Sequence, residues 1–191
     1  MKRFAFLLLA AAPAVAQHNA NNLNIGARFA ATEANSPPGA CGCFWLTGAA
    51  ADAALPLLPR ISAVVEVAGQ TTAKVPGTTR GLSEITLLAG PRYTLPLRHL
   101  NLNAQALFGA ARGFDSDFVL TPTSHKDTST NFSMALGGSL DLPLTRTLTL
   151  RAAQLDYLQT NLPNGQDNRQ RNLRVGAGLV FNIPLPTSRK R

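Results

Sequence analysis

Apolar and polar residues alternate with a period of two along most of the chain, and this period predicts β-strands. In the run 131–142 the even-numbered positions are mostly large and apolar, such as Phe132 and Leu136, whereas the odd-numbered positions are small or polar, such as Ser133 and Asp141. Eight runs of this kind occur, over residues 23–31, 44–55, 61–69, 84–95, 100–109, 131–142, 148–160 and 173–183. The sequence therefore predicts an all-β fold with eight strands.

The seventh run changes its alternation in the middle, which would turn half of its polar side chains to the opposite face. A β-bulge at Ala152 and Ala153 would remove this conflict, because one extra residue restores the pattern. Arg151 and Asp156 would then lie on the same polar face. The sequence predicts a bulge at this position.

The connections between the runs alternate between short and long. Each short connection begins with the same Leu-Pro-Leu sequence, and the long ones are richer in polar residues. The short connections cover 56–60, 96–99 and 143–147, and the long ones cover 32–43, 70–83, 115–129 and 161–170. Short turns at one end and long loops at the other are typical of an antiparallel up-and-down β-barrel, and in an outer membrane the short turns face the periplasm.

The first residues have the pattern of an export signal. Lys2 and Arg3 precede an apolar run over 4–12, and the small residues Ala14 and Ala16 form a cleavage site before position 17. No later stretch approaches the roughly 18–20 apolar residues that a transmembrane helix needs, so a mature chain that enters a membrane must cross it as strands. The predicted segments are a signal peptide over 1–16, a barrel over 17–183 and a basic tail over 184–191.

The sizes of the side chains on the two faces indicate which face meets lipid. The polar face carries mainly Gly, Ala, Ser and Asn, which suit the narrow interior of an eight-stranded barrel, whereas the other face carries Leu, Ile, Val, Phe and Tyr. We therefore expect a transmembrane barrel whose apolar face contacts outer-membrane lipid. The alternative is a soluble, lipocalin-like container that binds a lipid or another small molecule inside.

Aromatic residues of the apolar face occur near the ends of the predicted strands, which is typical of the two aromatic girdles of a membrane barrel. The expected girdle at the long-loop ends consists of Phe29, Trp45, Phe132 and Tyr157, and the one at the short-turn ends consists of Tyr93 and Phe181.

Charged residues of both signs fall on the polar face, and we expect them to pair inside the barrel. They are Arg28, Asp52, Glu66, Glu84, Arg92, Asp141, Arg151, Asp156 and Arg174. Unpaired charges in so confined a space would be costly, so a hydrogen-bonded network is expected to plug the lumen and fix the register of the strands. The alternative is a gated, narrow pore, although eight strands leave little room for a continuous aqueous path.

The chain is basic, with 18 Lys and Arg against 10 Asp and Glu. These basic residues are scattered singly, apart from Arg169 with Arg171 and the tail 189–191, so nucleic acid is not an expected partner.

No set of residues with catalytic, metal-binding or cofactor-binding spacing stands out, and we expect no enzyme activity, no metal and no cofactor. Ser124, His125 and Asp127 are the nearest approach to a hydrolytic set, but they are neighbours within one predicted loop. Export would permit a disulfide between Cys41 and Cys43, although a ring closed over one intervening glycine would be strained. The sequence leaves open whether these two loop cysteines are joined or free.

Four segments, 87–94, 104–110, 155–160 and 173–181, resemble the small outer-membrane β-barrel family, similar to the barrel domain of outer membrane protein A. The motifs that carry the likeness are Gly-Pro-Arg-Tyr after an apolar strand and Arg-x-Gly-x-Gly-x-x-Phe in the last strand, and the likeness covers nearly the whole mature chain. Such barrels often end on an aromatic residue, whereas here ten residues follow Phe181.

The resemblance implies a structural, surface or adhesion-related role without a cofactor. The expected partners are outer-membrane lipid and, during biogenesis, the barrel-assembly machinery. The sequence names no partner for the loops.

Overall fold

The computed structural model describes residues 22–36, 42–76, 79–121, 124–164 and 167–186. The predicted signal peptide over 1–16, Cys41 and the end of the basic tail lie outside these residues. Within the described residues all regular elements are strands, so none of them is a helix that could cross a membrane. The strands are β1 Asn22–Ser36, β2 Gly42–Leu58, β3 Ile61–Thr72, β4 Leu82–Pro96, β5 Asn101–Phe114, β6 Phe118–Thr121, β7 Ser124–Lys126, β8 Ser129–Pro143, β9 Leu148–Thr160 and β10 Gln170–Pro184.

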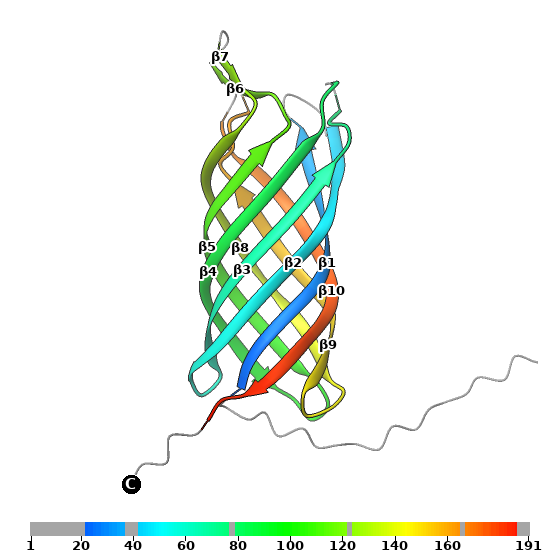
Figure 1. The fold of residues 1–191 in the computed structure, drawn as a ribbon, viewed down its shortest axis with the longest axis vertical. Coiled ribbons are helices and arrows are strands. Elements are labelled where there is room, and N and C mark those ends of the chain that lie inside the picture. The colour runs from blue at the N-terminus through cyan, green and yellow to red at the C-terminus, as the bar shows by residue number, and fades with distance from the viewer. Residues whose placement is uncertain (1–21, 37–41, 77–78, 122–123, 165–166, 187–191) are drawn as a thin grey trace, which may run out of the picture.

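Eight of these strands close into one antiparallel barrel in the order β1-β10-β9-β8-β5-β4-β3-β2 (Figure 1). Each strand pairs with the next barrel strand along the chain, and the first pairs with the last from Asn22 opposite Pro184 to Glu33 opposite Leu173. The short turns lie together at one end of the barrel, at the bottom of Figure 1, and the long loops lie at the other. The predicted all-β, eight-stranded, up-and-down barrel is confirmed.

Several strands extend further toward the long-loop end than their apolar pattern predicts. The first one was expected to end at Ala31, but it continues to Ser36 because these residues remain paired with β2, with Glu33 opposite Trp45. Backbone hydrogen bonding with a neighbour keeps polar residues in a strand after the apolar alternation has stopped. The structural loops are correspondingly shorter than the polar segments in the sequence.

The predicted bulge in β9 is confirmed. Arg151 pairs with Asp141 and the next pair joins Ala153 to Leu140, which leaves Ala152 as the extra residue. The pairing with β10 shifts at the same place, between Gly176 and Gly178. Because of this bulge, Arg151, Gln154 and Asp156 are all buried inside the barrel.

The long connection 115–129 was expected to be a loop, but it contains the hairpin of β6 and β7. These strands have four and three residues, too short for a period of two to be recognisable in the sequence. The hairpin stands above the long-loop end of the barrel (Figure 1). At the base of the hairpin the ring of Phe118 is buried against Gly113. A Cβ atom on residue 113 would collide with this ring.

The interior of the barrel is not only polar. Six buried side chains form an apolar cluster within it, namely Ala54, Val64, Leu88, Leu107, Ala135 and Leu158. All six lie on the inward positions of their strands, where the sequence pattern had indicated small and polar residues. The leucines fill volume that glycine and alanine leave empty on neighbouring strands, so the lumen is packed partly by an apolar layer.

Candidate functional site

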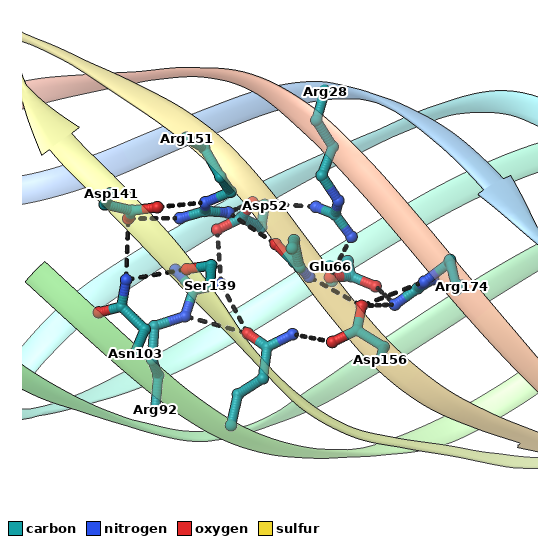
Figure 2. A network of polar contacts seen from close by, with 12 residues as sticks. Arg28, Asp52, Glu66, Arg92, Asn103, Ser139, Asp141, Arg151, Asp156 and Arg174 are labelled. Atoms are coloured by element: carbon teal, nitrogen blue, oxygen red, sulfur yellow. Dashed lines mark hydrogen bonds and ion pairs between the residues drawn. The ribbon is translucent and has the colours of Figure 1, made fainter.

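The main polar feature of the molecule is a network of charged and amide side chains across the barrel lumen (Figure 2). Every barrel strand contributes to it, because inward positions alternate with outward positions along each strand. Its charged members are Arg28, Asp52, Glu66, Arg92, Asp141, Arg151, Asp156 and Arg174, all of them buried. Four arginines face four carboxylates, so these eight residues carry no net formal charge.

Asp52 of β2 contacts three arginines, more than any other carboxylate of the network. Its Oδ1 lies 3.2 Å from Nη1 of Arg28 and 2.8 Å from Nη1 of Arg151. Its Oδ2 lies 2.9 Å from Nη2 of Arg92. One carboxylate therefore joins arginines from β1, β4 and β9, three strands that are far apart in the sequence.

Glu66 of β3 joins the two strands that close the barrel. Its Oε2 accepts a hydrogen bond of 2.7 Å from Arg28 of β1, and its Oε1 accepts one of 2.5 Å from Arg174 of β10. Arg174 also donates to Oδ2 of Asp156, at 3.0 Å. The seam between the first and last strands is thus bridged by ion pairs in addition to its backbone ladder.

Asp141 forms the other end of this chain of charges. Nε and Nη2 of Arg151 donate to its two oxygens at 3.0 and 3.2 Å, which is a bidentate pair. Asn103 donates to the same carboxylate at 2.9 Å and to the hydroxyl of Ser139 at 2.9 Å. The arginines and carboxylates therefore alternate continuously from Asp141 to Asp156.

Two glutamines connect separate parts of the network. The Gln105 amide accepts from Arg92 at 2.8 Å and donates to Oδ1 of Asp156 at 3.0 Å. The Gln154 amide accepts from Arg151 at 3.1 Å and donates to the other oxygen of Asp156 at 2.8 Å. Neither glutamine was among the predicted network residues, although both lie on the polar face that the alternation defines.

Glu84, the ninth residue predicted for the network, is buried but forms no ion pair within the described residues. It lies opposite Gln70 of β3, whereas Glu66 lies opposite Leu88. Glu84 therefore lies four residues, or about 13 Å, nearer to the long loops than Leu88, the residue opposite Glu66. The sequence places Glu84 on the correct face, but its distance along the strand keeps it outside the network.

The two ends of the lumen differ. At the short-turn end a cavity of about 330 Å³ opens, lined mainly by Asn, Thr and Ser side chains and bounded by Arg92 and Arg151 of the network. At the long-loop end Val75, Phe118 and Leu162 are buried, each from a different loop. The lumen therefore has an open, polar cavity at the short-turn end, with the ion-paired network beside it, and apolar side chains are buried among the long loops.

The outer surface carries large apolar side chains. Among the described residues 24 of them are exposed, including all six predicted girdle residues, Phe29, Trp45, Phe132, Tyr157, Tyr93 and Phe181. Phe29 does not lie near a strand end, because β1 is longer than expected and Phe29 is its eighth residue of 15. The other five lie nearer the ends of their strands.

The described residues of the long loops form polar contacts that differ from the set of Ser124, His125 and Asp127. His125 contacts Asp117 at 2.9 Å and Asp127 pairs with Arg80 at 2.7 Å, all exposed, so His125 and Asp127 each have a partner outside the proposed hydrolytic set. In another loop the Asn164 side chain and the Arg169 backbone N–H donate to Asp167 and hold the pKa of that carboxyl below its ordinary value.

The described residues contain one disulfide-bonded cysteine and no candidate metal cluster. The described residues contain no group of three or more His, Cys, Asp or Glu side chains that could hold a metal ion. Cys43, near the start of β2, is disulfide-bonded. Cys41, its predicted partner, lies outside the described residues.

Comparisons with known proteins support the fold through structure and not through sequence. No protein-family model matches the chain, and no curated protein matches it. Neisserial surface protein A superposes with a TM-score of 0.62 at 17% identity, over 83% of this chain and 96% of that protein. The outer membrane protein OprG from Pseudomonas aeruginosa gives 0.57 at 12%, over 90% and 100%. Ail, the attachment invasion locus protein of Yersinia pestis, gives 0.55 at 14%, over 84% and 99%. The chain therefore has the fold of the small eight-stranded outer-membrane β-barrels.

Proposed function

We propose that the chain is an integral outer-membrane protein with a structural or surface-interaction role, in a barrel that is closed to solute flow. The observation that carries the proposal is the inverted distribution of side chains. Arginines and carboxylates are buried in the lumen, and large apolar residues face outward.

The energy of the outer surface favours a membrane over water. Burying a large apolar side chain is worth about 1.5–3 kcal/mol, so leaving half of one in water sacrifices about 1 kcal/mol. For the 24 exposed side chains the total is on the order of 20 kcal/mol. Transfer of this surface into a nonpolar surrounding would recover that free energy, which exceeds the net stability of about 5–15 kcal/mol of a typical folded protein, and this favours a membrane.

The same distribution disfavours the soluble container. A lipocalin-like protein would need an apolar interior that holds the ligand and a polar exterior that faces water. Here the open part of the lumen is lined largely by Asn, Thr and Ser.

A structural or surface role is favoured over a pore because the lumen is obstructed twice. The ion-paired network crosses it, and Phe118, Leu162 and Val75 are buried at the long-loop end. The long loops would then be the surface that meets partners outside the cell, and lipid and the assembly machinery would be the partners within the envelope. No catalytic role is part of the proposal.

Cell fractionation tests the location. Cells that express the full precursor are separated into soluble, inner-membrane and outer-membrane fractions, and detergent extracts are run on gels with and without heating. We expect recovery in the outer membrane and a heat-dependent mobility shift. Recovery as a soluble periplasmic protein would overturn the proposal and favour the container.

Planar-bilayer recording tests the closed lumen. The purified barrel is expected to insert without discrete conductance steps at moderate voltage. Reproducible single-channel steps from folded protein would replace the closed barrel with the narrow pore, while leaving the outer-membrane location in place.

A further inference from the structure

The three short turns each carry one arginine and no acidic residue. Arg60 follows β2, Arg98 follows β4 and Arg146 follows β8, and all three side chains are exposed. Because the barrel is antiparallel, these three turns lie at the same end (Figure 1). The acid nearest to them in the sequence, Asp141, is buried and paired with Arg151.

None of the three turn arginines forms an ion pair within the described residues. Their charges are therefore available to a partner outside the chain. The long-loop end differs, because its basic residues are mixed with acidic ones and partly paired with them, as in Arg80 with Asp127. The charged residues of the short turns are therefore all positive, whereas the long-loop end carries charges of both signs.

Arg60 occupies a backbone position that does not favour arginine. Its φ angle is 70°, in the left-handed region where glycine or asparagine is the usual residue. A two-residue turn with glycine there would avoid this strain. Arginine at this point therefore carries a conformational cost that glycine would not have.

Exposed leucines stand beside these arginines. Leu57 and Leu58 precede Arg60, Leu97 precedes Arg98, and Leu144 lies close to Arg146; all four leucines are among the exposed large apolar residues. They continue the outward apolar surface of the barrel to the edge of the turns. Each turn therefore presents an apolar side chain next to a positive charge, which matches an acyl chain next to an anionic headgroup.

We propose that Arg60, Arg98 and Arg146 form a rim that binds the phosphate headgroups of anionic phospholipids in the leaflet at the short-turn end. This inference rests on the proposed insertion of the barrel in the outer membrane. Each arginine near an anionic lipid surface strengthens binding to that surface by about fivefold. The guanidinium group suits this partner because it donates to phosphate in a bidentate manner.

The test measures lipid selectivity by electron paramagnetic resonance of the barrel in phosphatidylcholine bilayers with trace spin-labelled phosphatidylglycerol or phosphatidylcholine. The fraction of motionally restricted label reports lipid held at the protein surface. The wild type should hold phosphatidylglycerol in preference to phosphatidylcholine. The triple variant R60Q/R98Q/R146Q should lose most of this preference, and R60K/R98K/R146K, which keeps the charges, should retain it.

A matched control removes three charges from the other end, as R112Q/R169Q/R171Q, and should retain the preference. If this control loses selectivity while R60Q/R98Q/R146Q keeps it, or if the wild type has no preference, the rim does not bind anionic lipid. Each variant is first checked for the heat-dependent gel shift. Failure of the wild type to insert into bilayers at all would overturn the proposed membrane function together with this inference, whereas insertion without selectivity overturns the inference alone.

Discussion

Replacing Asp52 by Asn tests whether the lumen network stabilises the barrel. The change keeps the size of the side chain but removes the negative charge that Arg28, Arg92 and Arg151 share at 2.8–3.2 Å. The network then holds four arginines against three carboxylates in a space that water barely reaches. Removing one partner of a buried ion pair costs about 3–5 kcal/mol, and we expect D52N to fall in this range.

Urea unfolding of the barrel in lipid vesicles, followed by the gel shift, measures the effect. With a dependence of about 2 kcal/mol per molar urea, a loss of 4 kcal/mol lowers the midpoint by about 2 M. The matched control D127N changes the same group in an exposed pair with Arg80, where such pairs contribute at most about 1 kcal/mol. The double variant D52N/R92Q restores neutrality and should be more stable than D52N alone. A midpoint for D52N equal to that of D127N would refute the stabilising role of the network.

Three further substitutions follow from the same structure, each measured by the urea midpoint in vesicles. Glu84→Gln should not lower stability, because this buried carboxylate forms no ion pair within the described residues; a loss as large as that of D52N would contradict the boundary of the network. Gly26→Ala should destabilise the barrel by about 1–3 kcal/mol, because the new Cβ atom would lie 2.6 Å from a carboxylate oxygen of Asp52. In the control Gly69→Ala the new Cβ atom meets no atom within 4 Å, so this variant should be neutral or stabilising. Leu155→Arg, at the exposed middle of β9, should cost about 2–4 kcal/mol in a bilayer, and an equal effect from Ala73→Arg in a loop would argue against a lipid-facing surface.

The alternation of residues was sufficient to predict the eight barrel strands, the face of each charged residue of the network and the bulge at Ala152 and Ala153. These features depend on a period of two, which a sequence displays directly. The strand ends were less predictable, because backbone pairing carries β1 to Ser36 after its apolar pattern has stopped.

The pairs within the network could not be predicted, because they depend on how far each strand is shifted along its neighbours. That shift determines that Glu66 meets Arg28 and Arg174 across the seam while Glu84 lies outside the network. The packing of the inward leucines could not be predicted for a related reason. Alternation places Leu107 and Leu158 on the inward face, but which residues of other strands they pack against depends on the register.

The central claim is that the apolar face of the barrel contacts lipid, and tryptophan fluorescence tests it most directly. Trp45 is the only tryptophan of the chain, so W45F/F108W moves the probe to an exposed position in the middle of β5, and W45F/A73W moves it to a loop. Each protein is refolded into vesicles of phosphatidylcholine with brominated acyl chains and is also titrated with aqueous iodide. We expect the probe at position 108 to be quenched by the brominated lipid and protected from iodide, with the reverse at position 73. Quenching of the probe at position 108 by iodide and not by brominated lipid would contradict a lipid-facing barrel surface.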